Sequence, residues 1–168
     1  MSTAAAPDRL RIAAAQYDIG RPANWVDYEH KVTRWVDEAA AAGAALLLFP
    51  EYFAMELAAL YDPDVALSLP RQLAAMQDVL PDFLGLFARL ARSRRVCLVA
   101  GSFPVALADG SYRNRSHLFG TDGTHGFQDK LQMTRFETEE WHIGAGDTLK
   151  VFDTAVGRIG INICYDSE

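Results

Sequence analysis

Three segments of the sequence each place a reactive side chain at the end of a run that predicts a strand. They are Glu51 in LLLFPEYF, Lys130 in GFQDKLQM and Cys164 in GRIGINICYDSE. The ends of strands in an open α/β sheet are where ligand crevices form. Taken singly, these residues also fit a solvated loop carboxylate, a surface charge and a small core residue. The polar residues directly after Cys164 favour a strand-to-loop elbow with the thiol at the rim. Together the segments indicate chemistry that uses a carboxylate, an ammonium and a thiol.

The combined pattern resembles the nitrilase or carbon–nitrogen hydrolase superfamily over essentially the whole chain. The matching features, in order, are Ala15-Gln16, FPE at 49–51, DK at 129–130 and GxxICYD at 160–166. The resemblance implies an α/β fold, a four-layer αββα sandwich with a mixed sheet, usually assembled as a homo-oligomer through its helix face. Family members are typically longer. We therefore expect residues 10–168 to be the N-terminal portion of such a domain, truncated after the nucleophile, behind a flexible leader at residues 1–9.

The resemblance also implies roles for the three residues. Cys164 would be the nucleophile, Glu51 the general base and Lys130 the group that stabilises the oxyanion, with the backbone N–H of Tyr165 as a second donor. A thiol is mostly protonated at neutral pH, and a neighbouring carboxylate can accept its proton as it attacks. A donor to the developing oxyanion is typically worth roughly 3–4 kcal/mol in the barrier. The three groups are thus expected to converge in one cleft.

Many family members carry a second glutamate between the lysine and the cysteine, which positions the substrate or the first glutamate. The segment FETEEWHIGAGD offers Glu137, Glu139 and Glu140. Aligning Gly146-Asp147 with the family's glycine–aspartate turn favours Glu139. The other two are then expected to be solvated loop carboxylates.

The resemblance also bears on the substrate. Cys-Tyr-Asp at 164–166 is more similar to the amidase and carbamoylase branches than to true nitrilases, which usually have Cys-Trp-Glu. The expected reaction is hydrolysis of small linear amides or N-carbamoyl compounds through a thioester, releasing ammonia or an amine. The alternatives are a same-fold acyltransferase, a true nitrilase, and a non-enzymatic or inactive module. Phe53, Trp141 and Tyr165 are candidates for the pocket lining, although aromatic residues near a site more often serve packing.

The elements that must position these residues can be read from apolar periodicity. Asn24 is a typical N-cap, and apolar residues at three- to four-residue spacing from Trp25 to Ala39 predict a helix that ends at Gly43. A second amphipathic helix is expected around residues 81–91, with Pro81 in its first turn. Strands are expected at 10–17, 44–49, 96–103, 115–120, 125–130, 148–152 and 158–164. This order predicts an α/β layered fold with a mixed sheet, whose second face needs a further sheet or subunit.

Composition narrows the classes of partner. The 168 residues carry a formal net charge of −6, with the charges dispersed, so neither a nucleic-acid surface nor docking on an acidic membrane is expected. Cys97 and Cys164 cannot form a disulfide framework, and free thiols suit a cytoplasmic enzyme. The four histidines lack metal-ligand spacing, and no phosphate-binding glycine loop is present, so no metal or other cofactor is expected.

Overall fold

The computed structural model describes residues 9–168, so the leader expected at residues 1–9 lies, apart from Arg9, outside the described residues. The helices are α1 (Trp25–Ala41), α2 (Pro63–Ala66), α3 (Leu69–Met76), α4 (Leu80–Arg94) and α5 (Arg135–Glu139), with 3-10 turns η1 (Phe53–Leu60), η2 (Gln77–Val79) and η3 (Cys164–Ser167). The strands are β1 (Ile12–Ala14), β2 (Leu46–Leu48), β3 (Cys97–Ala106), β4 (Tyr112–Phe119), β5 (His125–Asp129), β6 (Ile143–Gly144), β7 (Val151–Thr154) and β8 (Gly157–Gly160).

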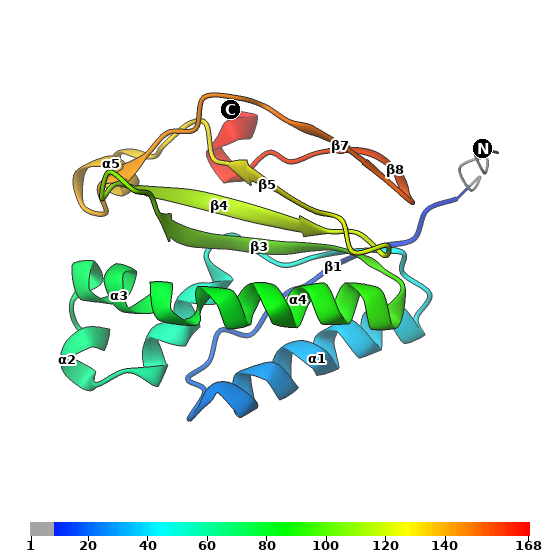
Figure 1. The fold of residues 1–168 in the computed structure, drawn as a ribbon, viewed down its shortest axis with the longest axis horizontal. Helices are drawn as coiled ribbons and strands as arrows, with labels where there is room; N and C mark the ends of the chain where they lie inside the picture. The colour runs from blue at the N-terminus through cyan, green and yellow to red at the C-terminus, as the bar shows by residue number, and fades with distance from the viewer. Residues whose placement is uncertain (1–8) are drawn as a thin grey trace.

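The main sheet is mixed, as the order of elements predicts. Its strands follow the order β1-β2-β3-β4-β5, and β6 pairs with β4. The first three strands are parallel, while β4 is antiparallel to β3 and β5. Parallel neighbours require crossover connections, and these are supplied by α1 between β1 and β2 and by α2 to α4 between β2 and β3. Figure 1 shows α1 and α4 along one face of the sheet and the β7–β8 hairpin over the other. This succession agrees with the first three layers of the expected αββα sandwich.

Helix α1 forms where the periodicity predicts it. The side chain of Asn24 accepts a hydrogen bond from an amide of the first turn, and Tyr28, Val32 and Val36 are buried against the sheet. Gly43 follows the helix with a φ of 80°, a conformation that glycine adopts without a steric penalty. The predicted N-cap, apolar face and stop are therefore confirmed.

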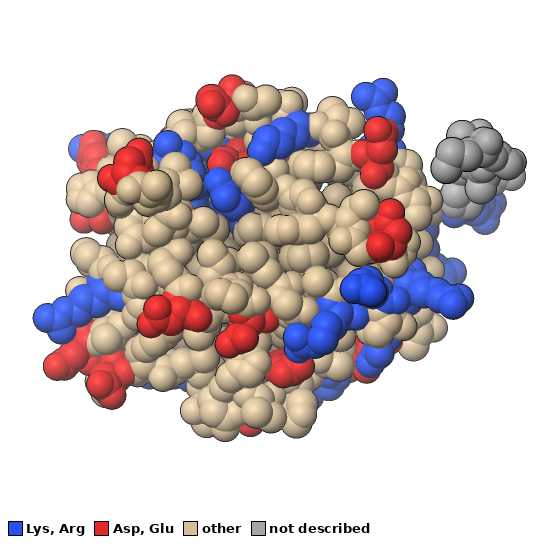
Figure 2. Space-filling model, in the orientation of Figure 1, with Lys and Arg blue, Asp and Glu red and all other residues tan. Residues whose placement is uncertain are grey.

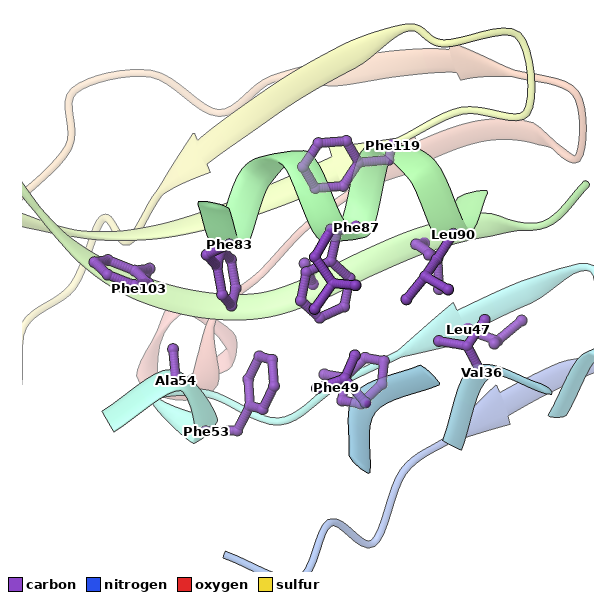
Figure 3. Close-up of a cluster of buried hydrophobic side chains, with 14 of the residues drawn as sticks. Val36, Leu47, Phe49, Phe53, Ala54, Phe83, Phe87, Leu90, Phe103 and Phe119 are labelled. Carbon is purple, nitrogen blue, oxygen red and sulfur yellow. The ribbon is translucent and has the colours of Figure 1, made fainter. Parts of the chain in front are cut away.

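Aromatic side chains fill the core between the helices and the sheet (Figure 3). The rings of Phe49 and Phe53 lie 4.9 Å apart and those of Phe83 and Phe87 4.8 Å apart. Aromatic pairs at such distances stabilise beyond the area that they bury. Because Phe49 and Phe53 flank the turn that follows β2, this packing holds that turn firmly against the sheet.

The opposite face of the sheet has its own smaller core. Leu46, Cys97, Val99 and Leu118 contact Ile161 and the inner side of the β7–β8 hairpin. A second, two-stranded sheet thus covers part of the apolar face that the sequence analysis expected a further sheet or subunit to cover. Cys97 is buried within the sheet, in agreement with its interpretation as an inert core residue.

Some strand boundaries differ from the prediction. The run 10–17 forms a strand only over Ile12–Ala14, and the run 158–164 is a strand only to Gly160. After Gly160 the chain leaves the ladder: the backbone N–H of Ile163 donates to the side chain of Asp166 instead of a neighbouring strand. The polar residues after Cys164 therefore end the strand earlier than its apolar letters suggest.

The surface carries charges of both signs. Figure 2 shows acidic and basic side chains interspersed on one face of the molecule. Over residues 9–168, no helix has the length and apolar character needed to cross a bilayer.

Candidate active site

Glu51 is carried on a tight turn after β2. The next residue, Tyr52, has a φ of 55°, and its backbone N–H donates to the hydroxyl of Ser102, 2.9 Å away. The turn lies so close to β3 that a Cβ on Gly101 would stand 2.2 Å from the carbonyl oxygen of Pro50. Gly101 therefore permits this approach, at an irregularity in the β3–β4 register. The result is a half-buried Glu51 carboxylate held at the edge of the sheet.

Lys130 lies at the end of β5 and is 1% exposed, so its interpretation as a surface charge is wrong. Its backbone N–H donates to Asn114 O at 2.9 Å, and its carbonyl accepts from Gly146 N at 2.7 Å. The ammonium donates to Glu51 Oε1 at 2.8 Å and to Glu137 Oε2 at 2.7 Å. Burial opposes the charge of Lys130, but the hydrogen bonds to the two carboxylates outweigh it and raise the pKa of the ammonium. Lys130 therefore remains protonated at neutral pH.

The glutamate beside Lys130 is Glu137, which corrects the choice of Glu139. Glu137 occupies the third position of α5, where Thr134 and Glu137 form a capping box. Burial favours its neutral form, but hydrogen bonds from Lys130, Thr134 and Tyr52 outweigh that effect and lower its pKa to about 2. Glu139, two residues further along the helix, faces solvent and pairs with Arg135, with 54% of its side chain exposed. The Thr-x-x-Glu spacing is the sequence signal that could have identified Glu137.

Asn114, on β4, is a site residue that the sequence analysis missed. It is fully buried, and its amide Nδ2 donates to Glu51 Oε1 at 2.8 Å and to Glu137 Oε1 at 3.1 Å. One neutral donor thus ties together two carboxylates that would otherwise repel each other. The only signal in the sequence is a polar side chain in a strand whose later residues are apolar.

Cys164 begins the 3-10 turn η3 with a φ of 48°, in the left-handed region, and is exposed. Such a conformation is costly for a residue with a side chain and is often found at functional sites. Partial burial and the neighbouring Glu51 carboxylate raise the pKa of the Cys164 thiol. The charge of Lys130 and the backbone N–H of Tyr165 act in the opposite direction. The thiol therefore lies near the carboxylate that could accept its proton, and both groups border the same cavities.

These residues line one hollow. A cavity of about 170 Å³ is bordered by Glu51, Lys130, Glu137 and Cys164 together with Thr134 and three aromatic side chains, Tyr52, Phe136 and Trp141. A second hollow of about 120 Å³ lies on the other side of Glu51 and Cys164. An acyl group in the first cavity would meet the thiol, the carboxylate and the ammonium together. Within residues 9–168, no group of three or more acidic, histidine or cysteine side chains is arranged to hold a metal ion.

The predicted aromatic lining is only partly found at the cavity. Trp141 borders it, with its ring 4.8 Å from that of Tyr52. Phe53 is fully buried in the aromatic core and faces away from the site, which corrects its expected role. The phenol ring of Tyr165 points outward, 45% of the residue being exposed, and its contribution to the site is the backbone N–H beside the sulfur. Tyr52, next to Phe53, takes the place expected of Phe53 because the left-handed turn directs it to the cavity.

Comparison with known proteins identifies the class to which this fold and site correspond. The family model for carbon–nitrogen hydrolases matches residues 11–168. The chain is 34% identical over 160 residues to the probable hydrolase YhcX of Bacillus subtilis. This match covers 95% of this chain and 30% of YhcX. It is 30% identical over 149 residues to an omega-amidase, NIT2-B, of Xenopus laevis, covering 83% of this chain and 50% of that protein. The chain therefore belongs to the carbon–nitrogen hydrolase family.

Solved structures show the same fold. A carbon–nitrogen hydrolase from Helicobacter pylori superposes with a TM-score of 0.72 at 19% identity, covering 94% of this chain and 52% of that one. A second structure is a variant of an amidase from Nesterenkonia sp. with acrylamide added at its active-site cysteine. It superposes with a TM-score of 0.67 at 22% identity, covering 95% of this chain and 59% of the amidase. The chain spans 30% to 50% of the length of the two curated relatives above.

Proposed function

We propose that this chain carries the catalytic centre of an enzyme that hydrolyses the carbon–nitrogen bond of small linear amides or N-carbamoyl compounds through a thioester on Cys164. One observation carries the proposal. The buried ammonium of Lys130 lies 2.8 Å from Glu51 and 2.7 Å from Glu137, and the exposed Cys164 thiol borders the same two cavities as Glu51. Buried ion pairs offer little net stability compared with apolar packing. A lysine held in this way beside an exposed thiol therefore favours a catalytic role.

The geometry supports a definite sequence of steps. Glu51 accepts the thiol proton as the sulfur of Cys164 attacks the carbonyl carbon. The negative charge that develops on the carbonyl oxygen is stabilised by the Lys130 ammonium and the backbone N–H of Tyr165. The tetrahedral adduct collapses, the carbon–nitrogen bond breaks, and the amine or ammonia leaves with the proton from Glu51. Water then attacks the thioester while Glu51 takes a proton from it, and the acid departs as the thiol is restored.

The relatives support an amide rather than a nitrile as substrate. Several curated relatives are omega-amidases, and one of the solved structures is an amidase with an adduct at its active-site cysteine. Cys-Tyr-Asp at residues 164–166 agrees with that branch. The aromatic wall formed by Tyr52 and Trp141 suits the apolar part of a small acyl group.

Replacement of the nucleophile tests the proposal directly. Cys164→Ala is expected to abolish ammonia release from a panel of linear amides and N-carbamoyl compounds, because no thioester can form. Cys97→Ala is the matched control: this thiol is buried in the smaller core under the β7–β8 hairpin and borders neither hollow of the site, so activity is expected to persist. Turnover that survives in Cys164→Ala, or a wild-type protein with no thiol-dependent turnover on the whole panel, contradicts the proposal.

Two further properties are proposed with this function. Both cysteines are free thiols, which supports a reducing compartment such as the cytoplasm.

The resemblance to the family supports a homo-oligomer that associates through the face formed by α1 and α4. Light scattering coupled to size exclusion should give a mass at least twice that of one chain; a monomeric mass over the micromolar range contradicts the assembly.

A further inference from the structure

The side chain of Asp166 joins two segments that are far apart in the sequence. Its Oδ1 accepts hydrogen bonds from the backbone N–H groups of Leu131 at 2.9 Å and Gln132 at 2.8 Å. Its Oδ2 accepts from the backbone N–H of Ile163 at 3.0 Å. One carboxylate therefore binds three main-chain donors. Hydrogen bonds to a charged acceptor are about twice as strong as those between neutral groups.

The three backbone donors lie next to two of the proposed catalytic residues. Leu131 and Gln132 directly follow Lys130, and Ile163 directly precedes Cys164. Among the hydrogen bonds of residues 9–168, those of Asp166 are the ones that tie the backbone at 161–168 to another part of the chain, while Ile161 and Ile163 pack against the core under the β7–β8 hairpin. A role confined to shaping the turn would need only the bond to Ile163.

We infer that Asp166 is a positioning residue, which fixes the Cys164 elbow to the Lys130 loop so that the sulfur and the ammonium reach the same carbonyl group. This inference rests on the proposed function of Cys164. The elbow has a strained φ of 48° and follows a strand that has already left its ladder, so it needs such an external attachment. A misplacement of about 1 Å can cost about 100-fold in rate.

The test compares Asp166→Ala and Asp166→Asn with Asp153→Asn. Asp153 is the matched control because its side chain is 92% exposed and pairs only with the exposed Arg158. In Asp166→Ala, kcat is expected to fall about 100-fold with KM changed much less, because the cavity that binds the acyl group remains. In Asp166→Asn, Oδ1 can still accept from the Lys130 loop, but the amide nitrogen cannot accept from Ile163. A loss of about tenfold in kcat is therefore expected.

A second measurement separates positioning from general stability. The pH dependence of alkylation of Cys164 by iodoacetamide reports its thiol pKa, which partial burial and the nearby Glu51 carboxylate raise in the wild type. When the elbow is released, this pKa is expected to fall toward that of an ordinary thiol. Alkylation in Asp153→Asn should follow the wild-type curve. If Asp166→Ala does not fold, the kcat and the alkylation profile of Asp166→Asn test the positioning role of Asp166.

The outcomes distinguish this inference from the function on which it rests. Wild-type kcat and a wild-type alkylation profile in the folded Asp166 variants, with Cys164→Ala inactive, overturn the positioning role alone. Activity in Cys164→Ala overturns the proposed function instead. Parallel losses of kcat and of the raised thiol pKa in the Asp166 variants support the inference.

Discussion

At the scale of single residues, the site is a compact set of charges in which each group constrains the next. Lys130 is held by Glu51 and Glu137, and Asn114 donates to both of these carboxylates. Glu51 is therefore shared between an ammonium and an amide, and it borders the same cavity as the Cys164 thiol. Such a network specifies where each atom lies, and loss of one member leaves the others with buried, unpaired charge.

A pair of glutamate substitutions tests this network. Glu137→Gln keeps the shape but removes the charge, so Lys130 loses one of its two anionic partners. The free energy of unfolding is expected to fall by roughly 1–3 kcal/mol, and kcat by about 100-fold. Glu139→Gln, an exposed position of the same helix, should change stability by less than about 0.5 kcal/mol and leave kcat unchanged. Urea unfolding and steady-state kinetics measure both effects. Equal effects of the two substitutions contradict the assignment of Glu137 to the site.

At the scale of elements, the site depends on how closely the turn after β2 approaches β3. Gly101 has a φ of 52°, and an added Cβ would stand 2.2 Å from Pro50 O and 2.6 Å from the ring of Phe53. The aromatic core on the other side prevents the turn from moving away freely. The position of Glu51 thus follows from the packing of two elements as well as from its own sequence.

Gly101→Ala should therefore disturb both stability and activity. The left-handed conformation and the clash with Pro50 are together expected to lower the free energy of unfolding by roughly 2–4 kcal/mol, and the displaced Glu51 to reduce kcat. Gly110→Ala is the control, because Gly110 also has a positive φ, of 82°, but an added Cβ meets nothing within 4 Å. Its cost should be about 1 kcal/mol with kcat retained. Wild-type activity in Gly101→Ala would show that the close approach does not position Glu51.

At the scale of the whole molecule, the layers place the charged site at the edge between two hydrophobic cores. One core lies between the helices and the main sheet, and the other between that sheet and the β7–β8 hairpin (Figure 1). Residues from β4, α5 and η3 and from the segments that follow β2 and β5 meet there, so the ionisation of the site is coupled to folding of the entire domain. Stability should accordingly depend on pH through Glu137.

The pH dependence has a definite sign. The pKa of Glu137 is about 2 in the folded protein and 4.5 for an ordinary glutamate, so its ionised form stabilises the fold above pH about 4.5. This contribution is lost as the pH falls toward about 2. The difference in unfolding free energy between wild type and Glu137→Gln should therefore be largest near neutral pH and shrink between pH about 5 and 2. Denaturant unfolding at a series of pH values measures it, and a constant difference over that range contradicts the prediction.

The sequence alone determined the features that depend on local pattern. The α1 helix from its Asn24 cap, the buried β2 and β3 segments, and the mixed α/β organisation all follow from periodicity, capping and turn residues. The same holds for the positions of Glu51, Lys130 and Cys164 at or just beyond the ends of predicted strands. These properties depend on residues within a few positions of one another, and so they can be predicted from the sequence alone.

Only the tertiary structure decided which neighbouring side chains face the site. It distinguished Glu137 from Glu139 and Tyr52 from Phe53, and it added Asn114 and the long-range contacts of Asp166. In each case adjacent residues of similar chemistry differ in the direction that their side chains take. That direction is set by a capping box, a left-handed turn or a hydrogen bond to a segment more than twenty residues away, and contacts at that separation exist only once the layers have packed.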